Sequence, residues 1–536
     1  MTRIALKEGL LSSIDDASTA RLLGGRCSEC ERFTFPAQEI CPYCFHSGCV
    51  TALLSPEGVV EVCTTVINRP PGYEGNLPFG FGVVELREGL QIIARINHPE
   101  HARPGTAVHL VLDRLCTDGE GREVITYAFE AVESPGLGTA ALREVTLGGE
   151  PLPRSGAGLR SGRPVYISGV GIHPFGRFEN KTVTDMGVAA VRMALSDAGG
   201  PPVFQAAYCG TVYSGVAAGH KVLTTLGLTG MPIMNIEAGC ASGGAALALG
   251  AQAVASGRYD RVLVFGMEKM PKGIIRSSFF EPWREQGGLA VTPAYFALRA
   301  RRLMRDSGVT SEHLAQVSVK NHQNGVHNPY AMFRKPFTLD AVLASPMVCD
   351  PLRLYMLCSP NEGAAAVVLS ATPGPVRVVA ASVRSHLPGN VLGEHTPLSG
   401  LAVFDGASPT ALAAREAYDA AGLGPGDLDV VELQDTDAAR ELLSYEELGL
   451  CAPGESGRWI ATGHTEMTGA LPVNPSGGLL SKGEPLGASG IGQIVELYWQ
   501  LRGAAGPRQV AEAKLALAHT VGRGANASVV ILEQQT

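Results

Sequence analysis

Residues 474–490 read Asn-Pro-Ser-Gly-Gly-Leu-Leu-Ser-Lys-Gly-Glu-Pro-Leu-Gly-Ala-Ser-Gly, and this stretch decides the fold. Its glycines and prolines predict a loop that opens a helix, because glycine permits tight backbone turns and proline suits the first helical turn. Glu484 stands in the middle of this loop. A carboxylate among small residues at the start of a helix is a candidate acid or base.

A second stretch, residues 235–250, reads Asn-Ile-Glu-Ala-Gly-Cys-Ala-Ser-Gly-Gly-Ala-Ala-Leu-Ala-Leu-Gly. It follows a predicted strand and opens an alanine-rich helix. A cysteine at a helix N-terminus faces unpaired N–H groups and the positive end of the helix dipole, and both favour the thiolate. The small neighbours leave room for a substrate carbonyl. Cys240 is therefore the candidate nucleophile; the alternative interpretation is a buried cysteine chosen for its size.

From residue 163 onward, apolar strands alternate with alanine-rich helices, which predicts an α/β fold. A helix is expected at 183–198 with Thr182 as its N-cap, and another at 411–421. Two successive α/β units of similar order suggest an internal duplication. The expected strands are 165–170, 262–266, 375–381, 430–433 and 528–532.

The first stretch resembles the Gly-His-Pro motif of the thiolase superfamily, with Glu484 at the histidine position, and the second resembles the nucleophile motif of that family. The resemblance covers about residues 164 to 536 and is closest to the SCP-x or lipid-transfer branch. It implies a duplicated five-layered αβαβα fold, a homodimer, coenzyme A thioester substrates and active-site loops from both halves. Further similar stretches are 266–270, 320–333 and 358–369.

The sequence departs from the family pattern at the catalytic positions. The SCP-x branch carries His-Asp-Cys-Phe where this chain has Gln434, Asp435, Thr436 and Asp437. The C-terminal loop at 518–525, Ala-His-Thr-Val-Gly-Arg-Gly-Ala, contains no cysteine either. Of the usual four catalytic groups, only Cys240 remains.

These changes alter the proton transfers that the site can perform. A glutamate charge repels a thiolate and raises the thiol pKa; two negative charges 4 Å apart cost on the order of 4 kcal/mol at an effective dielectric near 20. Glu484 is therefore protonated when Cys240 is charged, or it takes the proton during attack. Gln434 can donate an N–H to a thioester oxygen but cannot act as an acid or base. Thr436 cannot replace a second cysteine, so reversible thiolysis of ordinary β-ketoacyl-CoA is disfavoured.

Two histidines are candidates for the missing proton transfer. His464 lies with Glu466 in a loop that precedes the glycine-rich stretch, and His519 stands before the final glycine-rich turn. A backbone N–H of that turn normally completes an oxyanion hole in the family. Histidines in loops are more often solvated than catalytic, so His464 is the weaker part of the predicted set Cys240, Glu484, Gln434 and His464.

Two Cys-x2-Cys pairs lie near the N-terminus: Cys27 with Cys30, and Cys41 with Cys44. This spacing predicts one structural Zn²⁺ held by four thiolates, with no open position for catalysis. Cys49 and His46 are alternative ligands, and the interpretation without metal is a set of reduced, buried cysteines. Residues 58 to 132 then alternate apolar and polar residues in about five short runs, which predicts a small closed barrel.

A zinc ribbon followed by a barrel resembles the DUF35 module, in which a rubredoxin-like ribbon precedes an OB-fold. The stretch 70–86, Pro-Pro-Gly-Tyr-Glu-Gly-Asn-Leu-Pro-Phe-Gly-Phe-Gly-Val-Val-Glu-Leu, carries the barrel part of this resemblance. The resemblance implies a module that helps thiolase-like enzymes to bind CoA esters. The expected organisation is a ribbon segment at 1–50, a barrel at 51–133, a linker at 134–163, and thiolase halves at 164–372 and 373–536.

The composition of the 536 residues excludes several classes of protein. A hydrophobic content of 45% with only 18% charged residues suits buried α/β cores and not disorder. The net charge of −8 without a basic aromatic face disfavours nucleic-acid binding. No apolar signal core opens the chain and no long apolar run occurs, so a cytoplasmic protein without membrane insertion is expected. The 12 cysteines do not form a disulfide framework in such a compartment.

Three functions remain open from the sequence. The first is an acyltransferase or condensing enzyme in which Cys240 is acylated by a CoA or carrier thioester and Glu484 is the acid or base. The second is a retro-aldolase that cleaves a β-hydroxyacyl-CoA of the steroid-side-chain type without an acyl-enzyme. Such aldolases carry tyrosines at the positions of Gln434 and Glu484, so the chain departs from them as well. The third is a non-catalytic scaffold that binds a CoA ester or lipid.

Overall fold

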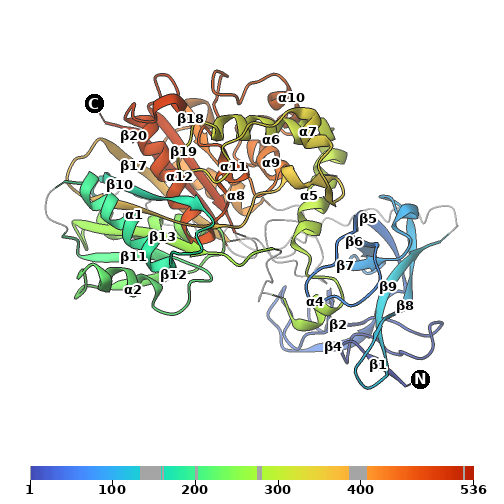
Figure 1. Ribbon diagram of the computed structural model, residues 1–536. Coiled ribbons are helices and arrows are strands. Elements are labelled where there is room, and N and C mark those ends of the chain that lie inside the picture. Colours follow the sequence, from blue (N-terminus) through green and yellow to red (C-terminus); the bar gives the residue numbers. More distant parts are fainter. Residues whose placement is uncertain are drawn as a thin grey trace.

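The computed structural model describes residues 2–132, 159, 162–199, 203–273, 280–385, 407–522 and 526–535. Figure 1 shows a large α/β body formed by the C-terminal two thirds of the chain and a smaller β-rich body formed by the N-terminal residues. The linker predicted at 134–163 lies almost entirely outside the described residues. None of the described helices is both long enough and apolar enough to cross a membrane.

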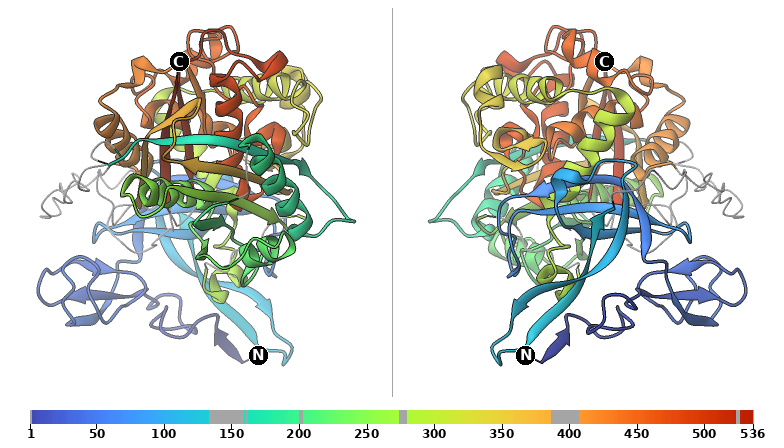
Figure 2. Two further views of the ribbon diagram at one scale, coloured as in Figure 1. Left: turned by 90° about the vertical axis from the view of Figure 1, so that its left-hand side faces the viewer. Right: turned by 90° about the vertical axis from the view of Figure 1, so that its right-hand side faces the viewer.

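The N-terminal body begins with a small three-stranded sheet of order β3-β2-β4. The tight turns between these short strands carry the paired cysteines. The three strands of this sheet are β2 (Leu23–Cys27), β3 (Phe33–Thr34) and β4 (Cys49–Leu53). Figure 2 shows this sheet at the periphery of the molecule, away from the α/β body in both views.

The predicted barrel is confirmed, and it closes through one strand. Strand β8 pairs with both β5 and β9, so the order β5-β6-β7-β9-β8 returns to β5. The alternating burial of β5 follows the period of two that the sequence shows. The bounds are β5 (Glu57–Val66), β6 (Phe79–Leu86), β7 (Gln91–Ile96), β8 (Ala107–Thr117) and β9 (Glu123–Ala131), with β1 (Arg3–Ala5) added in parallel to β9.

The α/β body contains two half-sheets with the same topology. In the first half the spatial order is β11-β13-β16-β10, and in the second it is β18-β19-β20-β17. When the edge strand β12 is left out, each half places its second, third, fourth and first strands side by side, which supports the duplication that the order of the predicted elements suggested. The bounds are β10 (Val165–Gly176), β11 (Ala206–Gly210), β13 (Arg261–Lys269), β16 (Glu362–Ser370), β17 (Val376–Ser385), β18 (Val430–Glu432), β19 (Leu515–Val521) and β20 (Asn526–Gln534).

Five layers result from these halves. Helices α3 and α12 contact each other and lie between the half-sheets, α1 covers the outer face of the first half, and α8 covers that of the second. Thr182 caps α1 through a capping box, as predicted. The bounds are α1 (Val183–Asp197), α2 (Ala218–Thr225), α3 (Ser242–Ala255), α8 (Pro409–Ala421), α9 (Ala438–Glu447) and α12 (Leu486–Leu501). Strand β12 (Ile233–Ile236) extends the first half at its edge.

The barrel is joined to the α/β body by strands that the sequence analysis did not predict. The hairpin of β14 (Met347–Cys349) and β15 (Leu352–Arg353) extends the barrel sheet through the pair Cys349 and Val66. Helix α5 (Thr292–Ser307) contacts β5 of the barrel. Its Tyr295 ring lies 5.0 Å from the Phe81 ring, and Arg305 Nη1 lies 3.0 Å from Glu61 Oε1. Buried residues of the barrel therefore share one hydrophobic core with α5 and with the β14–β15 hairpin.

Of the remaining helices, α4 lies beside the barrel (Figure 1), and the others border the second half. Helix α6 packs on α9, α10 and α11, and α7 packs on α6. The bounds are α4 (Pro282–Gln286), α6 (Ser311–Gly325), α7 (Leu339–Leu343), α10 (Ser456–Ala461) and α11 (Gly478–Lys482).

Candidate functional site

Cys240 lies in the turn between β12 and α3, two residues before Ser242 begins the helix. Gly239 has φ +58°, a conformation that glycine adopts without strain. The loop after β19 presses against this turn: a Cβ on Gly522 would lie 2.4 Å from the Ala238 carbonyl and 3.1 Å from the Cys240 nitrogen. The predicted helix-start position of Cys240 is therefore confirmed, and its thiol belongs to a partly exposed residue.

Glu484 occupies the matching position in the second half. It lies between α11 and α12, two residues before Leu486 begins α12, so candidate nucleophile and candidate base precede the two central helices in the same way. Glycines at the start of α12 pack closely against the first half. A Cβ on Gly266 would lie 1.9 Å from the Gly487 carbonyl oxygen, and a Cβ on Gly487 would lie 2.5 Å from the Gly210 carbonyl oxygen. These contacts explain the small residues that follow Glu484 in the sequence.

The Glu484 carboxylate accepts hydrogen bonds from two side chains. Gln434 Nε2 donates to Oε1 at 2.6 Å, and Cys358 Sγ donates to Oε2 at 3.3 Å. Both donors come from other loops: Gln434 follows β18, and Cys358 precedes β16. The carboxylate fixes the Gln434 amide, because the reversed amide would place two acceptor oxygens together. Within the described residues, Gln434 Oε1 is buried and has no hydrogen-bond partner.

Cys358 is a site residue that the sequence analysis missed. Burial raises the pKa of its thiol well above the ordinary value, and the charges of Glu484, Asp435 and Cys240 raise it further. Cys240 and Cys358 are therefore close enough to interact electrostatically, although they lie in different segments. One feature of the sequence could have drawn attention to Cys358, because this residue opens the stretch 358–369 that resembles the family. The distances along the chain from Cys358 to Cys240 and to Glu484 do not indicate that these side chains lie close together.

The other residues of the Gln-Asp-Thr-Asp segment hold the loops in place. Asp435 accepts hydrogen bonds from the Leu479 and Leu480 nitrogens at the start of α11, at 2.6 and 3.2 Å. Asp437 caps α9 and forms a buried ion pair with Arg299 of α5. Because α5 also contacts the barrel, one helix connects the barrel to the loop that carries Gln434.

The candidate histidines lie in different surroundings. The His464 ring lies 3.9 Å from the Trp459 ring, and burial lowers its pKa, as does the Arg458 charge. His519 is buried within β19, where its Nε2 lies 3.0 Å from Thr410 Oγ1 of α8. Glu466 lines a cavity of about 710 Å³ whose walls come from α6, α10 and residues 466–468, 475 and 507–509, and not from Cys240, Glu484, Gln434 or Cys358. The structure therefore brings Glu484, Gln434 and Cys358 into direct contact.

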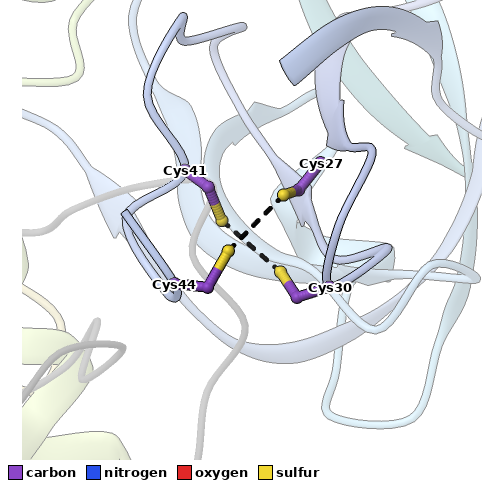
Figure 3. A group of neighbouring side chains, drawn as sticks. All are labelled: Cys27, Cys30, Cys41 and Cys44. Carbon is purple, nitrogen blue, oxygen red and sulfur yellow. Dashed lines mark hydrogen bonds between the residues drawn. The ribbon is translucent and has the colours of Figure 1, made fainter. Parts of the chain in front are cut away.

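The four paired cysteines converge as their spacing predicts (Figure 3). Their sulfurs all lie within 4.8 Å of one another, with 3.6 Å between Cys27 and Cys44 and 3.5 Å between Cys30 and Cys41. Four thiolates around a tetrahedral zinc with bonds of about 2.3 Å are separated by about 3.8 Å, so the cluster fits that ion. Cys49 and His46 do not belong to this cluster.

Comparisons with known proteins place each part of the chain. Residues 165–372 match the thiolase N-terminal domain, and residues 395–534 match the thiolase C-terminal domain-like family. The acetyl-CoA acetyltransferase of Methanothermobacter thermautotrophicus is 39% identical over 393 residues, which cover 69% of this chain and 100% of that protein. This chain belongs to the thiolase superfamily.

The N-terminal part of this thiolase-superfamily protein matches two further families. Residues 15–48 match the rubredoxin-like zinc ribbon of ChsH2, and residues 52–113 match the C-terminal OB-fold domain of ChsH2. The chain is therefore a fusion of a zinc-ribbon and OB-fold module with a thiolase domain, as the sequence predicts.

Other relatives differ in their described activities. Bovine sterol carrier protein 2 is 37% identical over 67% of this chain and 70% of its own length. The benzoylsuccinyl-CoA thiolase subunit BbsB of Thauera aromatica is 34% identical over 68% of this chain and 96% of its own. Among solved structures, an Ltp2–ChsH2(DUF35) aldolase has a TM-score of 0.61 at 25% identity, covering 69% of this chain and 98% of that chain. The superfamily assignment supports an enzyme of acyl-CoA chemistry.

Proposed function

We propose that the protein is an acyltransferase or condensing enzyme that takes an acyl group from a coenzyme A or carrier thioester onto Cys240, with Glu484 as acid and base. The observation that carries the proposal is the paired placement of these residues before the two central helices. Cys240 retains its helix-start position, small neighbours and partial exposure. The curated thiolase and acetyltransferase relatives support the same chemistry.

In this proposal the Glu484 carboxylate accepts the proton of the Cys240 thiol. A thiolate and a carboxylate repel each other at short range, so proton transfer accompanies attack on the thioester carbon and does not precede it. The immediate products are a Cys240 acyl-enzyme, a protonated Glu484 and the departing thiolate of coenzyme A or of the carrier. The proton held by Glu484 ends on this thiolate, which restores the Glu484 carboxylate before transfer to the acceptor.

The oxyanion that forms on the thioester carbonyl needs hydrogen-bond donors. One N–H of the Gln434 amide is used by Glu484, and the second remains for a substrate oxygen. The Cys240 nitrogen lies beside the Gly522 loop, so backbone N–H groups of these two segments are the other candidates. His464 is not required for either step and stays a subsidiary candidate.

Intact-mass measurement tests the proposal directly. The purified full chain is incubated with a series of straight-chain acyl-CoAs from acetyl to decanoyl, without an acceptor. We expect a mass increase equal to one acyl group, together with release of free CoA and loss of the alkylatable Cys240 thiol in the peptide map. Complete turnover of a thioester without any trapped adduct would reject the acyl-enzyme.

A second function, retro-aldol cleavage of a β-hydroxyacyl-CoA, is favoured by the comparisons. The solved Ltp2–ChsH2(DUF35) aldolase matches 69% of this chain at 25% identity, and residues 15–48 and 52–113 match the two ChsH2 families. In this reaction Glu484 removes the hydroxyl proton, the carbon–carbon bond breaks, and the thioester enolate leaves without an acyl-enzyme. Carbonyl product formed by the Cys240→Ala protein would favour it over acyl transfer.

We also propose that the protein forms a homodimer through the thiolase domain. Strand β12 is the edge of the nine-stranded sheet, and it pairs with β11 on one side only among the described strands. Met234 on this strand is 37% exposed, and Val216 before α2 is 90% exposed. An exposed strand edge with apolar neighbours suits pairing with a second copy.

The cysteine cluster is proposed to hold a structural zinc ion. We expect close to one zinc per chain by metal analysis, and loss of most of it in Cys41→Ser, because a small ribbon depends on its metal for folding. Cys49→Ser is the matched control, since this cysteine lies beside the cluster without belonging to it. Purified wild-type protein without zinc would remove the assignment.

A further inference from the structure

We infer that Cys358 is a second catalytic cysteine, which delivers the proton to the departing thiolate of coenzyme A and recovers it from Glu484. The inference rests on the proposed acyl transfer to Cys240. It assigns a role to a residue that neither the family motifs nor the family comparisons single out. It also supplies the second cysteine that the Gln-Asp-Thr-Asp segment lacks.

Cys358 contacts one of the two proposed catalytic groups and interacts electrostatically with the other. Its Sγ donates to Glu484 Oε2 at 3.3 Å, and Cys240 is near enough to influence its ionisation. Cys358 as a whole residue is partly exposed, while its thiol is buried beside Glu484. Glu484 therefore has one oxygen that contacts the Gln434 amide and one that contacts a thiol.

The surrounding backbone fixes Cys358 in this position. Its nitrogen donates to the Thr436 carbonyl at 2.9 Å, and the Glu484 nitrogen donates to the Ser359 carbonyl at 2.9 Å. Pro360 and Glu484 form a parallel bridge immediately after this contact. The loop that carries Cys358 is thus tied both to the Glu484 loop and to the segment that contains Gln434.

The chemistry of the thiol suits a proton donor. A thiol whose pKa lies well above the ordinary value stays protonated at neutral pH and can donate to a stronger base. The departing group, the thiolate of coenzyme A, is an alkyl thiolate like the conjugate base of Cys358. Once Glu484 has taken the Cys240 proton, it no longer carries the charge that helps to raise the pKa of Cys358, so this thiol becomes a better proton donor as the coenzyme A thiolate leaves.

The proton steps close without an external acid or base. Glu484 takes the Cys240 proton as the new carbon–sulfur bond forms. The bond between the acyl carbon and the coenzyme A sulfur breaks, and the leaving thiolate takes the Cys358 proton. Glu484 then returns its proton to Cys358. The net result is a thioester on Cys240 and free coenzyme A thiol, with Cys358 and Glu484 restored.

A leaving-group comparison with Cys358→Ala tests this role. Acylation of Cys240 is measured by rapid quench and intact mass, using the acyl-CoA that gives an adduct with the wild type and the S-phenyl thioester of the same acyl group. An aryl thiolate leaves without needing a proton. We expect the variant to acylate about 10²- to 10⁴-fold more slowly with the CoA ester but less than about tenfold more slowly with the phenyl ester.

The controls separate this role from a structural one. Cys358→Ser keeps a hydroxyl donor for Glu484 and is expected to show the same selective defect at a smaller size. Cys451→Ala changes a buried cysteine elsewhere and is expected to acylate normally with both esters. Equal slowing with both esters, or unchanged rates, would overturn the assignment. Absence of a wild-type adduct with every thioester would instead reject the proposed acyl transfer, and the role of Cys358 with it.

Discussion

Replacing Cys240 by alanine is expected to lower acyl transfer by at least about 10⁴-fold, because loss of a covalent nucleophile removes the whole two-step route. The acyl adduct should disappear from the intact mass. Substrate binding should change little, since the side chain is small and the turn before α3 is held by the Ser242 hydroxyl, which accepts from the Ala238 nitrogen and donates to the Gly239 carbonyl. Initial rates of CoA release, followed with a thiol reagent at saturating thioester, give the measurement.

Cys209→Ala is the control for Cys240→Ala, because it removes a thiol outside the glycine-rich turn that carries Cys240. Cys209 is fully buried on β11 and lies outside the site. Cys209→Ala is expected to keep normal turnover with a modest loss of thermal stability, because a small cavity forms in the core. Turnover of Cys240→Ala within tenfold of the wild type would contradict the acyl-enzyme and leave the retro-aldol reaction as the better explanation.

Replacing Glu484 by glutamine is expected to lower turnover by about 10²- to 10⁴-fold, since it removes the carboxylate that accepts hydrogen bonds from both Cys358 and Gln434. The substitution keeps the size of the side chain. It should also change a second property that can be measured independently of turnover, the pKa of Cys358. Without the Glu484 charge the pKa of Cys358 should fall, although burial keeps it above the ordinary value. The pH dependence of iodoacetamide alkylation at Cys358, read by peptide mass spectrometry, measures this shift.

Glu466→Gln is the comparison for Glu484. Glu466 lies beside the candidate His464 in the sequence, but its side chain lines the separate cavity beside α6 and α10. We expect near-normal turnover in this variant. Normal turnover of Glu484→Gln would return Glu484 to a structural role, and a larger loss in Glu466→Gln would move the base to that cavity.

The fusion of barrel and thiolase domain has a structural consequence for the site. Helix α5 packs on the barrel through Tyr295, and its Arg299 pairs with Asp437 next to Thr436. Removing one member of a buried ion pair leaves an uncompensated charge, so this contact fixes the Gln434 loop strongly. The hairpin of β14 and β15 adds a second connection through the barrel sheet.

The sequence alone determined the parts of this protein that depend on local patterns. The zinc ribbon follows from cysteine spacing, the barrel strands from period-two alternation, and the helix starts at Thr182 and Cys240 from capping and small residues. The thiolase fold follows from its motifs. These features are readable because neighbouring residues along the chain produce them.

The contacts between side chains of the site become visible only in the folded protein. Cys358 and Glu484 are 126 residues apart, and Gln434 and Glu484 are 50 apart, so no local pattern encodes their contacts. The repeated strand order that places Cys240 and Glu484 before equivalent helices is likewise a property of the folded sheets. Glu484 replaces the family histidine in sequence, but its chemistry is set by a thiol and an amide that reach it from two other loops. Such contacts arise from packing of the two halves, which the order of residues does not reveal.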